Sequence, residues 1–168
     1  MGIRPQAPPV LTDEFGAHRS SYSVPFTTSY AVSGVAEVTD DETQICALIE
    51  RWAEAVHTGD LDRVLADHST DIVMFDVPPP NDGVRGIEAY RETWPPFFEW
   101  QRRGATFEIV SLEVIAGDDV AFAYALLRCG TAEEHERDPD NRLRLSLGLR
   151  KEHGRWIVSH EHHSFPSP

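Results

Sequence analysis

The spacing of hydrophobic residues changes near Gly104. Before this point, from Asp40 onwards, apolar side chains recur three or four positions apart, a spacing typical of amphipathic helices. After it they alternate with polar side chains, which predicts strands with two chemically different faces. We therefore expect an α+β fold, with helices first and an antiparallel meander after them.

Three helices and one strand are predicted in the first half. Capping residues at 39–42 precede the first helix, Gly59 ends it, and Asp60 can cap a short second one. A strand from Ile72 to Phe75 is stopped by a run of prolines. The third helix begins near residue 87 and is expected to break at its Pro-Pro pair, Pro95 and Pro96.

The second half predicts four strands, at residues 107–115, 120–129, 143–150 and 155–165. The charged run from Thr131 to Asn141 is interpreted as a solvated hairpin loop. In the third of these strands leucines alternate with polar residues, among them Arg142, Arg144 and Ser146.

The chain of 168 residues is long enough for one full domain. Residues 1–39 are interrupted by prolines and show no sustained period, so we predict an irregular N-terminal extension followed by a domain over 40–168. A net charge of −13 argues against nucleic acid or an anionic membrane as partner. With no signal or membrane-spanning pattern, and with Cys46 and Cys129 as separate free thiols, we expect a soluble cytoplasmic protein.

The order of landmarks resembles the nuclear-transport-factor-2-like superfamily, and more narrowly its SnoaL-like and ketosteroid-isomerase-like branch. The motifs that carry the resemblance are Ala55–Asp62, Leu65–Asp71, Phe75-Asp76, Gly86–Tyr90 and the closing Gly154–Val158. The resemblance implies a cone, in which three N-terminal helices pack on a strongly curved, mixed but mainly antiparallel sheet that encloses a pocket. It also implies a homodimer through the outer face of the sheet.

Asp76 is the first candidate for chemistry. A carboxylate at the end of an apolar strand suggests a residue that faces a small-molecule pocket, although it can also cap the turn before the prolines. The resemblance places the family's general base at this position. In a dry pocket its pKa is expected to rise toward neutrality, which would suit proton abstraction next to a carbonyl.

The resemblance also assigns faces to the last two predicted strands. It turns the face with Arg142, Arg144 and Ser146 toward the cavity and the leucine face toward the dimer. On the final strand it places Glu161 and His163 in the cavity. His160 and His162 form a His-x-His pattern that can bind a metal, but the sequence offers no convincing third ligand, so no metal is expected.

Aromatic residues on the predicted helices supply the remaining candidates. The pattern predicts core positions for Trp52, Tyr90 and Trp94, and some of them should also wall the pocket. The resemblance puts Trp52 where the isomerases carry a tyrosine, and Ser146 where they carry a second aspartate. His57 and His68 lie near predicted helix ends and are expected at the surface or as caps.

The leading hypothesis is a cofactor-independent isomerase, cyclase or dehydratase that acts on a small, apolar, oxygen-bearing molecule. Asp76 would move the proton, while Arg144, Ser146 and His163 would stabilise the oxyanion. The alternative is a non-catalytic module whose pocket holds an anion on Arg142 and Arg144. A third possibility is a stable dimer with a vestigial pocket.

Overall fold

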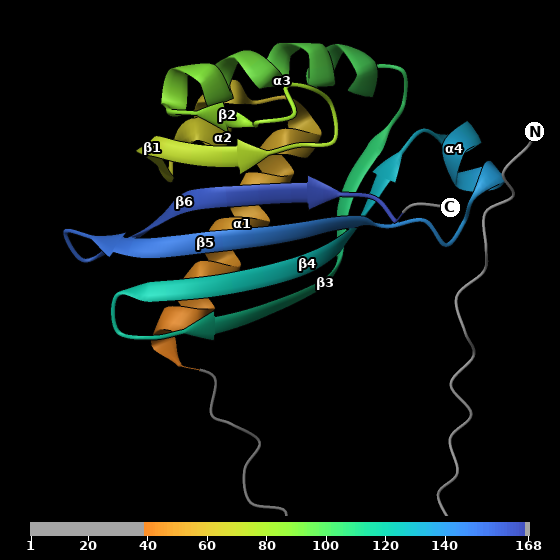
Figure 1. Cartoon of the computed structure of the whole chain (residues 1–168). Helices are drawn as coiled ribbons and strands as arrows, with labels where there is room; N and C mark the ends of the chain where they lie inside the picture. The colour runs from red at the N-terminus through yellow and green to blue at the C-terminus, as the bar shows by residue number, and fades with distance from the viewer. Residues whose placement is uncertain (1–38, 167–168) are drawn as a thin grey trace, which may run out of the picture. The chain divides into compact units, whose positions relative to one another are not determined.

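The fold is a curved sheet with helices across one face and along one end (Figure 1). The computed structural model describes residues 39–166, which belong to one unit of the chain, Ala36–Pro168. The helices are α1 (Asp40–Thr58), α2 (Leu61–Leu65), α3 (Ile87–Gln101) and α4 (Ala132–Arg137). The strands are β1 (His68–Phe75), β2 (Val84–Arg85), β3 (Thr106–Ala116), β4 (Val120–Gly130), β5 (Leu143–Glu152) and β6 (Arg155–Ser164).

Local signals define α1 at both ends, as predicted. Thr39 and Glu42 form a reciprocal capping box, in which each side chain accepts a hydrogen bond from the other's backbone N–H. Gly59 ends the helix in the left-handed region, with φ of 72°, where a residue without Cβ has no steric penalty. The buried stripe between these ends packs against the sheet and comprises Ile45, Leu48, Ile49, Trp52, Ala53, Ala55 and Val56.

The predicted break in α3 is wrong, because the helix continues through Pro95 and Pro96. Each proline lacks an N–H and weakens the helix by about 3 kcal/mol. Aromatic packing on both sides of the pair stabilises the continuous helix. Trp94 stacks on Phe98 with ring centroids 5.8 Å apart, and Phe97 meets Phe107 of β3 edge to face, also at 5.8 Å.

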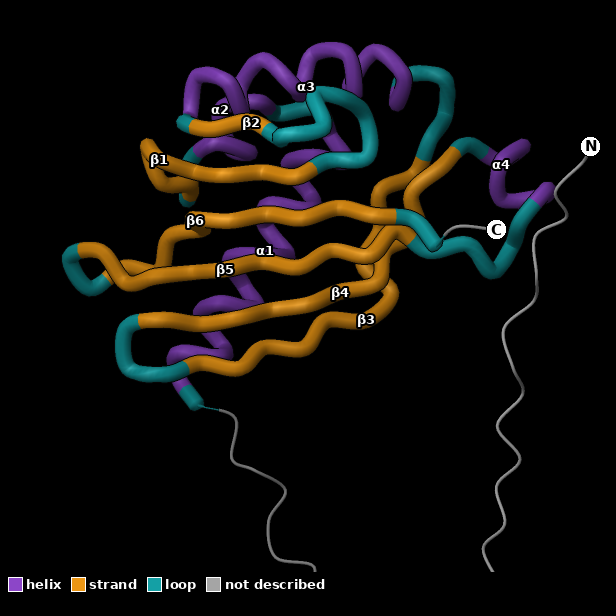
Figure 2. The backbone as a smooth tube through the Cα atoms, in the orientation of Figure 1, coloured by secondary structure: helices purple, strands orange, loops and turns teal. Residues whose placement is uncertain are grey.

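The sheet has the order β2-β1-β6-β5-β4-β3 (Figure 2). β1 pairs with β6 in parallel, and every other neighbouring pair is antiparallel. This arrangement confirms the predicted α+β fold with a mixed, mainly antiparallel sheet, and the sheet is not closed on itself. The parallel pairing brings the end of β1 next to the end of β6, which decides where the candidate residues meet.

The predicted face assignment of β5 is wrong. Leu143, Leu145, Leu147 and Leu149 are buried in the core, and Arg144 on the opposite face is exposed. The apolar stripe of α1 packs on the inner side of the sheet, so leucines facing it bury apolar area. Arginines facing the same stripe would lose their hydration without a partner.

A β-bulge divides β6 into two parts. Val158 pairs with Leu149 and His160 pairs with Gly148, so Ser159 is an extra residue on this strand. The Ser159 hydroxyl donates to the Gly148 carbonyl at 3.1 Å.

The bulge changes which residues of β6 face inward. Trp156 and Val158 are buried before it, and Glu161 and His163 are buried after it. These four residues alternate in phase only because one position is inserted between them. Glu161 and His163 therefore face the inner side of the sheet, as Trp156 and Val158 do.

The predicted loop at 131–141 contains a helix. Thr131 and Glu134 form a second capping box, and α4 follows it directly. His135 of this helix is buried and its Nε2 lies 2.9 Å from the Thr106 hydroxyl of β3. Only His135 of this run is buried, so α4 is anchored on the end of the sheet at that residue while its charged side chains are exposed.

The predicted N-terminal extension, residues 1–39, lies outside the described residues except for Thr39. Among residues 39–166, no helix combines the length and the hydrophobicity that crossing a membrane requires.

Candidate functional site

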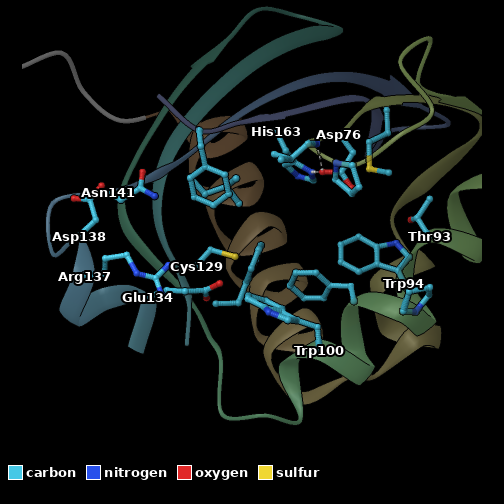
Figure 3. A pocket seen from close by; sticks show the side chains of 18 residues that line it. Asp76, Thr93, Trp94, Trp100, Cys129, Glu134, Arg137, Asp138, Asn141 and His163 are labelled. Carbon is cyan, nitrogen blue, oxygen red and sulfur yellow. Dashed lines mark hydrogen bonds and ion pairs between the residues drawn. The ribbon is translucent and has the colours of Figure 1, made fainter. Parts of the chain in front are cut away.

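A cavity of about 720 Å³ opens between α3, the ends of β1 and β6, and α4 (Figure 3). Most of its wall is apolar, formed by Met74, Trp94, Pro96, Phe97, Trp100, Phe107, Leu143 and Phe165. Polar residues gather in two places, the pair Asp76 and His163 on one side and the group Glu134, Arg137, Asp138 and Asn141 on the other. The volume is in the range of sites for small organic molecules.

Asp76 and His163 are brought together by the parallel pairing of β1 with β6. Asp76 directly follows β1, and His163 lies near the end of β6, one residue beyond the pairing of Phe75 with His162. The Nδ1 atom of His163 is 3.2 Å from Oδ1 of Asp76. The same Oδ1 accepts the Val77 backbone N–H at 2.8 Å.

The pair is largely shielded from water. The side chain of His163 is 7% exposed and that of Asp76 is 30% exposed. The indole of Trp52 stacks on the His163 ring, with centroids 6.4 Å apart and planes 18° from parallel. An ion pair in such surroundings is weakened less by salt than one at the surface.

The pKa of Asp76 moves opposite to the prediction. Burial alone would raise it, but the hydrogen bond and the charge of His163, together with the Val77 N–H, lower the pKa of Asp76 below its ordinary value. Burial would likewise lower the pKa of His163, but Asp76 and Glu161 raise it above its ordinary value. The pair therefore favours a carboxylate next to an imidazolium, not a protonated acid.

A second polar cluster lies behind this pair and is fully enclosed. Glu161 is completely buried, and its Oε1 accepts the Tyr90 hydroxyl at 2.9 Å and lies 2.6 Å from Nε2 of His68. The indole N–H of Trp52 donates to the Tyr90 oxygen at 3.4 Å. Burial, with the negative charge of Glu161, raises the pKa of Tyr90 well above its ordinary value, so its hydroxyl stays protonated.

The predicted binding residues separate into three groups. Trp94 lines the cavity. Trp52, Tyr90 and Glu161 are buried behind the cavity wall, where they form the second polar cluster. Arg142 lies outside the cavity and donates to the carbonyl oxygens of residues 139 and 141.

The structure does not bring Arg144 and Ser146 to the site. Both lie on the face of β5 opposite the buried leucines, and neither lines the cavity. The predicted basic pocket built on Arg142 and Arg144 is therefore wrong. The oxyanion contacts expected from Arg144 and Ser146 are lost for the same reason.

Sequence reasoning missed two sets of residues. His68 was expected at the surface, but it is the first residue of β1 and its side chain is 1% exposed. The rim residues Glu134, Arg137 and Asp138 were assigned to a solvated loop, although the spacing Thr-x-x-Glu at 131–134 is a capping-box signal that could have revealed α4.

Cys46 and Cys129 are free thiols, and burial together with nearby acids raises the pKa of Cys129 to about 12. Across the described residues, no three His, Cys, Asp or Glu side chains are grouped so that they could hold a metal ion.

Comparison with known proteins identifies the family. The model of the SnoaL-like domain matches residues 45–168. The chain belongs to this family. A search of curated proteins finds no match for this SnoaL-like chain.

Solved structures support the same assignment. An NTF2-like protein of unknown function from Pseudomonas putida is 33% identical, with a TM-score of 0.68, and the match covers 76% of this chain and 88% of that one. A candidate ketosteroid isomerase from Shewanella frigidimarina is 16% identical with a TM-score of 0.58, covering 70% and 92%. A candidate scytalone dehydratase from Novosphingobium aromaticivorans is 14% identical with a TM-score of 0.59, covering 76% and 85%. The last two matches show the fold alone.

Proposed function

We propose that this SnoaL-like protein is an enzyme that moves a proton on a small, mostly apolar, oxygen-bearing molecule held in the cavity. The reaction classes are isomerisation, aldol-type cyclisation and dehydration, and none of them needs a cofactor. The observation that carries the proposal is the hydrogen-bonded Asp76–His163 pair in the wall of an otherwise apolar cavity. Isomerase and dehydratase names among the structural neighbours are consistent with it.

Asp76 is the proposed base. Its Oδ1 is engaged by His163 and by the Val77 N–H, while Oδ2 accepts no hydrogen bond from the residues that the structure describes. Oδ2 would take a proton from the carbon next to a substrate carbonyl, and the C–H electron pair would move onto the carbonyl oxygen. Returning the proton to another carbon gives an isomer. Returning it to a β-hydroxyl group releases water.

The lowered pKa of Asp76 has a clear consequence for such a base. The carboxylate is ionised at neutral pH without further activation, but its intrinsic basicity is modest. Substrate that fills the apolar cavity removes water from the carboxylate, which destabilises the charged form and strengthens the base when substrate is present.

The test compares Asp76→Asn with a matched surface control, Asp118→Asn, because Asp118 is exposed in the turn between β3 and β4. The probes are a β,γ-unsaturated cyclohexenone, followed by the absorbance of its conjugated product, and a β-hydroxy ketone, followed by loss of water. Asp76→Asn should lower the rate by about a hundredfold or more, while Asp118→Asn keeps it. Equal rates in wild type and Asp76→Asn would remove Asp76 from the mechanism. Binding without turnover in the wild type would favour a non-catalytic role in ligand binding.

We also propose that two copies of the chain associate through the outer face of the sheet. Large apolar side chains are exposed there on β3 and β4, namely Ile115, Val120, Phe122, Tyr124 and Leu126. A contiguous group of this kind usually marks an interaction surface. The leucine row of β5, which the resemblance assigned to the dimer, is part of the core instead.

A further inference from the structure

Glu161 has no part in the chemistry proposed above, although it is the most deeply buried acid in the described structure. Its Oε1 is engaged by the Tyr90 hydroxyl and by His68 Nε2. Its Oε2 is buried and has no hydrogen-bond partner among residues 39–166. A buried carboxylate oxygen without a donor costs free energy, so the position calls for a specific reason.

The atom that faces Glu161 Oε2 is Nε2 of His163, 3.8 Å away. This nitrogen is also buried and without a hydrogen-bond partner in the described part of the chain. The opposite ring nitrogen, Nδ1, is 3.2 Å from Asp76 Oδ1. The imidazole of His163 therefore lies between two carboxylates, one at each nitrogen.

This arrangement selects one protonation state of the ring. In either neutral tautomer, one nitrogen would direct its lone pair at a carboxylate oxygen, which is repulsive. Only the imidazolium presents an N–H to both acids. The raised pKa of His163 agrees with this geometry, since burial opposes the shift and the two acids outweigh it.

His68 and Tyr90 fix the position of Glu161. The Nδ1 atom of His68 has no acceptor among the described residues, so its proton belongs on Nε2, where it donates to Oε1. The Tyr90 hydroxyl donates to the same oxygen. Both donors act on Oε1, and Oε2 is left directed toward His163.

We propose that Glu161 is a positioning residue, which keeps a proton on each nitrogen of His163 and so keeps the Nδ1–H directed at Asp76. This inference rests on the proposed function only for its catalytic consequence. If Asp76 is the base, loss of the Glu161 charge makes the His163 imidazolium give up its proton more readily. The charge on that imidazolium sets how strongly Asp76 holds a substrate proton.

Two acids face the His163 ring from the described elements packed around it. Asp76 follows β1, and α1 and β5 contribute Trp52 and Leu145, which do not titrate. The other titratable groups near the ring are Glu161 of β6, His68 of β1, Tyr90 of α3 and Cys129 of β4, which lines the same cavity. Tyr90 and Cys129 have raised pKa values and stay protonated, so among residues 39–166 the anions that face His163 are Asp76 and Glu161.

The decisive variant is Glu161→Gln. The glutamine oxygen can still accept from Tyr90 and His68, and its NH₂ group then faces His163 Nε2, where it stabilises the neutral tautomer. The titration midpoint of His163, followed by NMR of ring-labelled histidine, should fall by about one pH unit or more. Glu54→Gln, which removes an exposed carboxylate of α1, is the matched charge control and should leave the midpoint unchanged.

The titration is independent of turnover, so the two proposals can fail separately. A His163 midpoint in Glu161→Gln equal to that of the wild type overturns the role of Glu161, whatever the activity. If turnover exists, the step in the pH–rate profile that reports His163 should move to lower pH by the same amount as the midpoint, which a purely structural role would not produce. A step that stays in place overturns the catalytic part of the inference.

Two further measurements test the proposal if Glu161→Gln does not fold. In the wild type, ¹⁵N shifts should show His163 mainly as imidazolium at about pH 6.5, the ordinary pKa of histidine. A ring with one unprotonated nitrogen at that pH overturns the proposal. Tyr90→Phe removes a donor to Glu161 but keeps its charge, so the His163 midpoint should stay near the wild-type value, and a fall as large as that expected for Glu161→Gln would overturn the assignment.

Discussion

The replacement Leu147→Ala tests which face of β5 lies inside the molecule. The Leu147 side chain is 1% exposed and lies between Ala123 of β4 and Glu161 of β6. Truncating a leucine at such a site removes its transfer free energy and leaves a cavity, which together cost about 2–5 kcal/mol. A value near the middle, ~3 kcal/mol, lowers the folding equilibrium constant by roughly a hundredfold.

The matched control is Arg144→Ala on the other face of the same strand. The Arg144 side chain is exposed, so its truncation should change the free energy of unfolding by less than about 0.5 kcal/mol. The measurement is urea unfolding followed by tryptophan fluorescence, with a lower midpoint and an unchanged slope expected for Leu147→Ala. The melting temperature should fall by about 10 °C.

The opposite ranking would refute the reasoning. If Leu147→Ala lost less than about 0.5 kcal/mol while Arg144→Ala lost more, the arginine face would be the inner one, as the resemblance had implied. A loss in both variants would show that both faces of the strand are covered, which would favour an interface on the outer side of the sheet.

Three further predictions follow from the site and the surface. The stability that Asp76 and His163 give each other is lost below the lowered pKa of Asp76 and above the raised pKa of His163. The unfolding free energies of wild type and Asp76→Asn should therefore differ most at about pH 5–6 and converge at both extremes. A difference that stays constant with pH would contradict the coupling. Because the pKa of Cys129 is raised to about 12, its thiol in a Cys46→Ser background should react with a disulfide reagent at about pH 8 far more slowly in the native protein than after unfolding, and equal rates would contradict the raised pKa. Phe122→Glu should shift the sedimentation coefficient from dimer to monomer, and a wild type that sediments as a monomer would exclude the proposed interface.

Local signals in the sequence were enough to predict α1, α2 and the alternation of the strands. The cap at Thr39 and the left-handed Gly59 act within one turn of the helix, so the sequence around them determines the helix ends. The second helix begins after Asp60, whose side chain accepts the Arg63 N–H at 3.2 Å. Such contacts need no knowledge of the rest of the fold.

The faces of β5 and β6 could not be predicted in this way. Alternation in β5 fixes its period, but the choice of the inner face depends on what α1 presents to it. In β6 the alternation itself changes at Ser159, because the bulge depends on pairing with Gly148 across the sheet. The resemblance gave the correct orientation for His163 and the wrong one for Arg144.

His68 shows a further limit of sequence reasoning. It follows a short helix, where a histidine is most often a surface residue or a cap. Its burial is explained only by Glu161, 93 positions further along the chain, whose Oε1 lies 2.6 Å away. A single sequence carries no sign of that pairing.

The inserted Ser159 divides β6 into two parts with different roles. Its first part anchors the sheet with Trp156 and Val158, and its second part presents Glu161 and His163. Deleting Ser159 would place Glu161 two positions after Val158, so regular alternation would keep Glu161 and His163 inward. Pairing Ser159 regularly, without the bulge, would instead turn their neighbours His160 and His162 inward. A relative that lacks this single position can therefore present the same inward residues from a regular strand, and alignments across this strand need a gap there before any reactive residue is transferred.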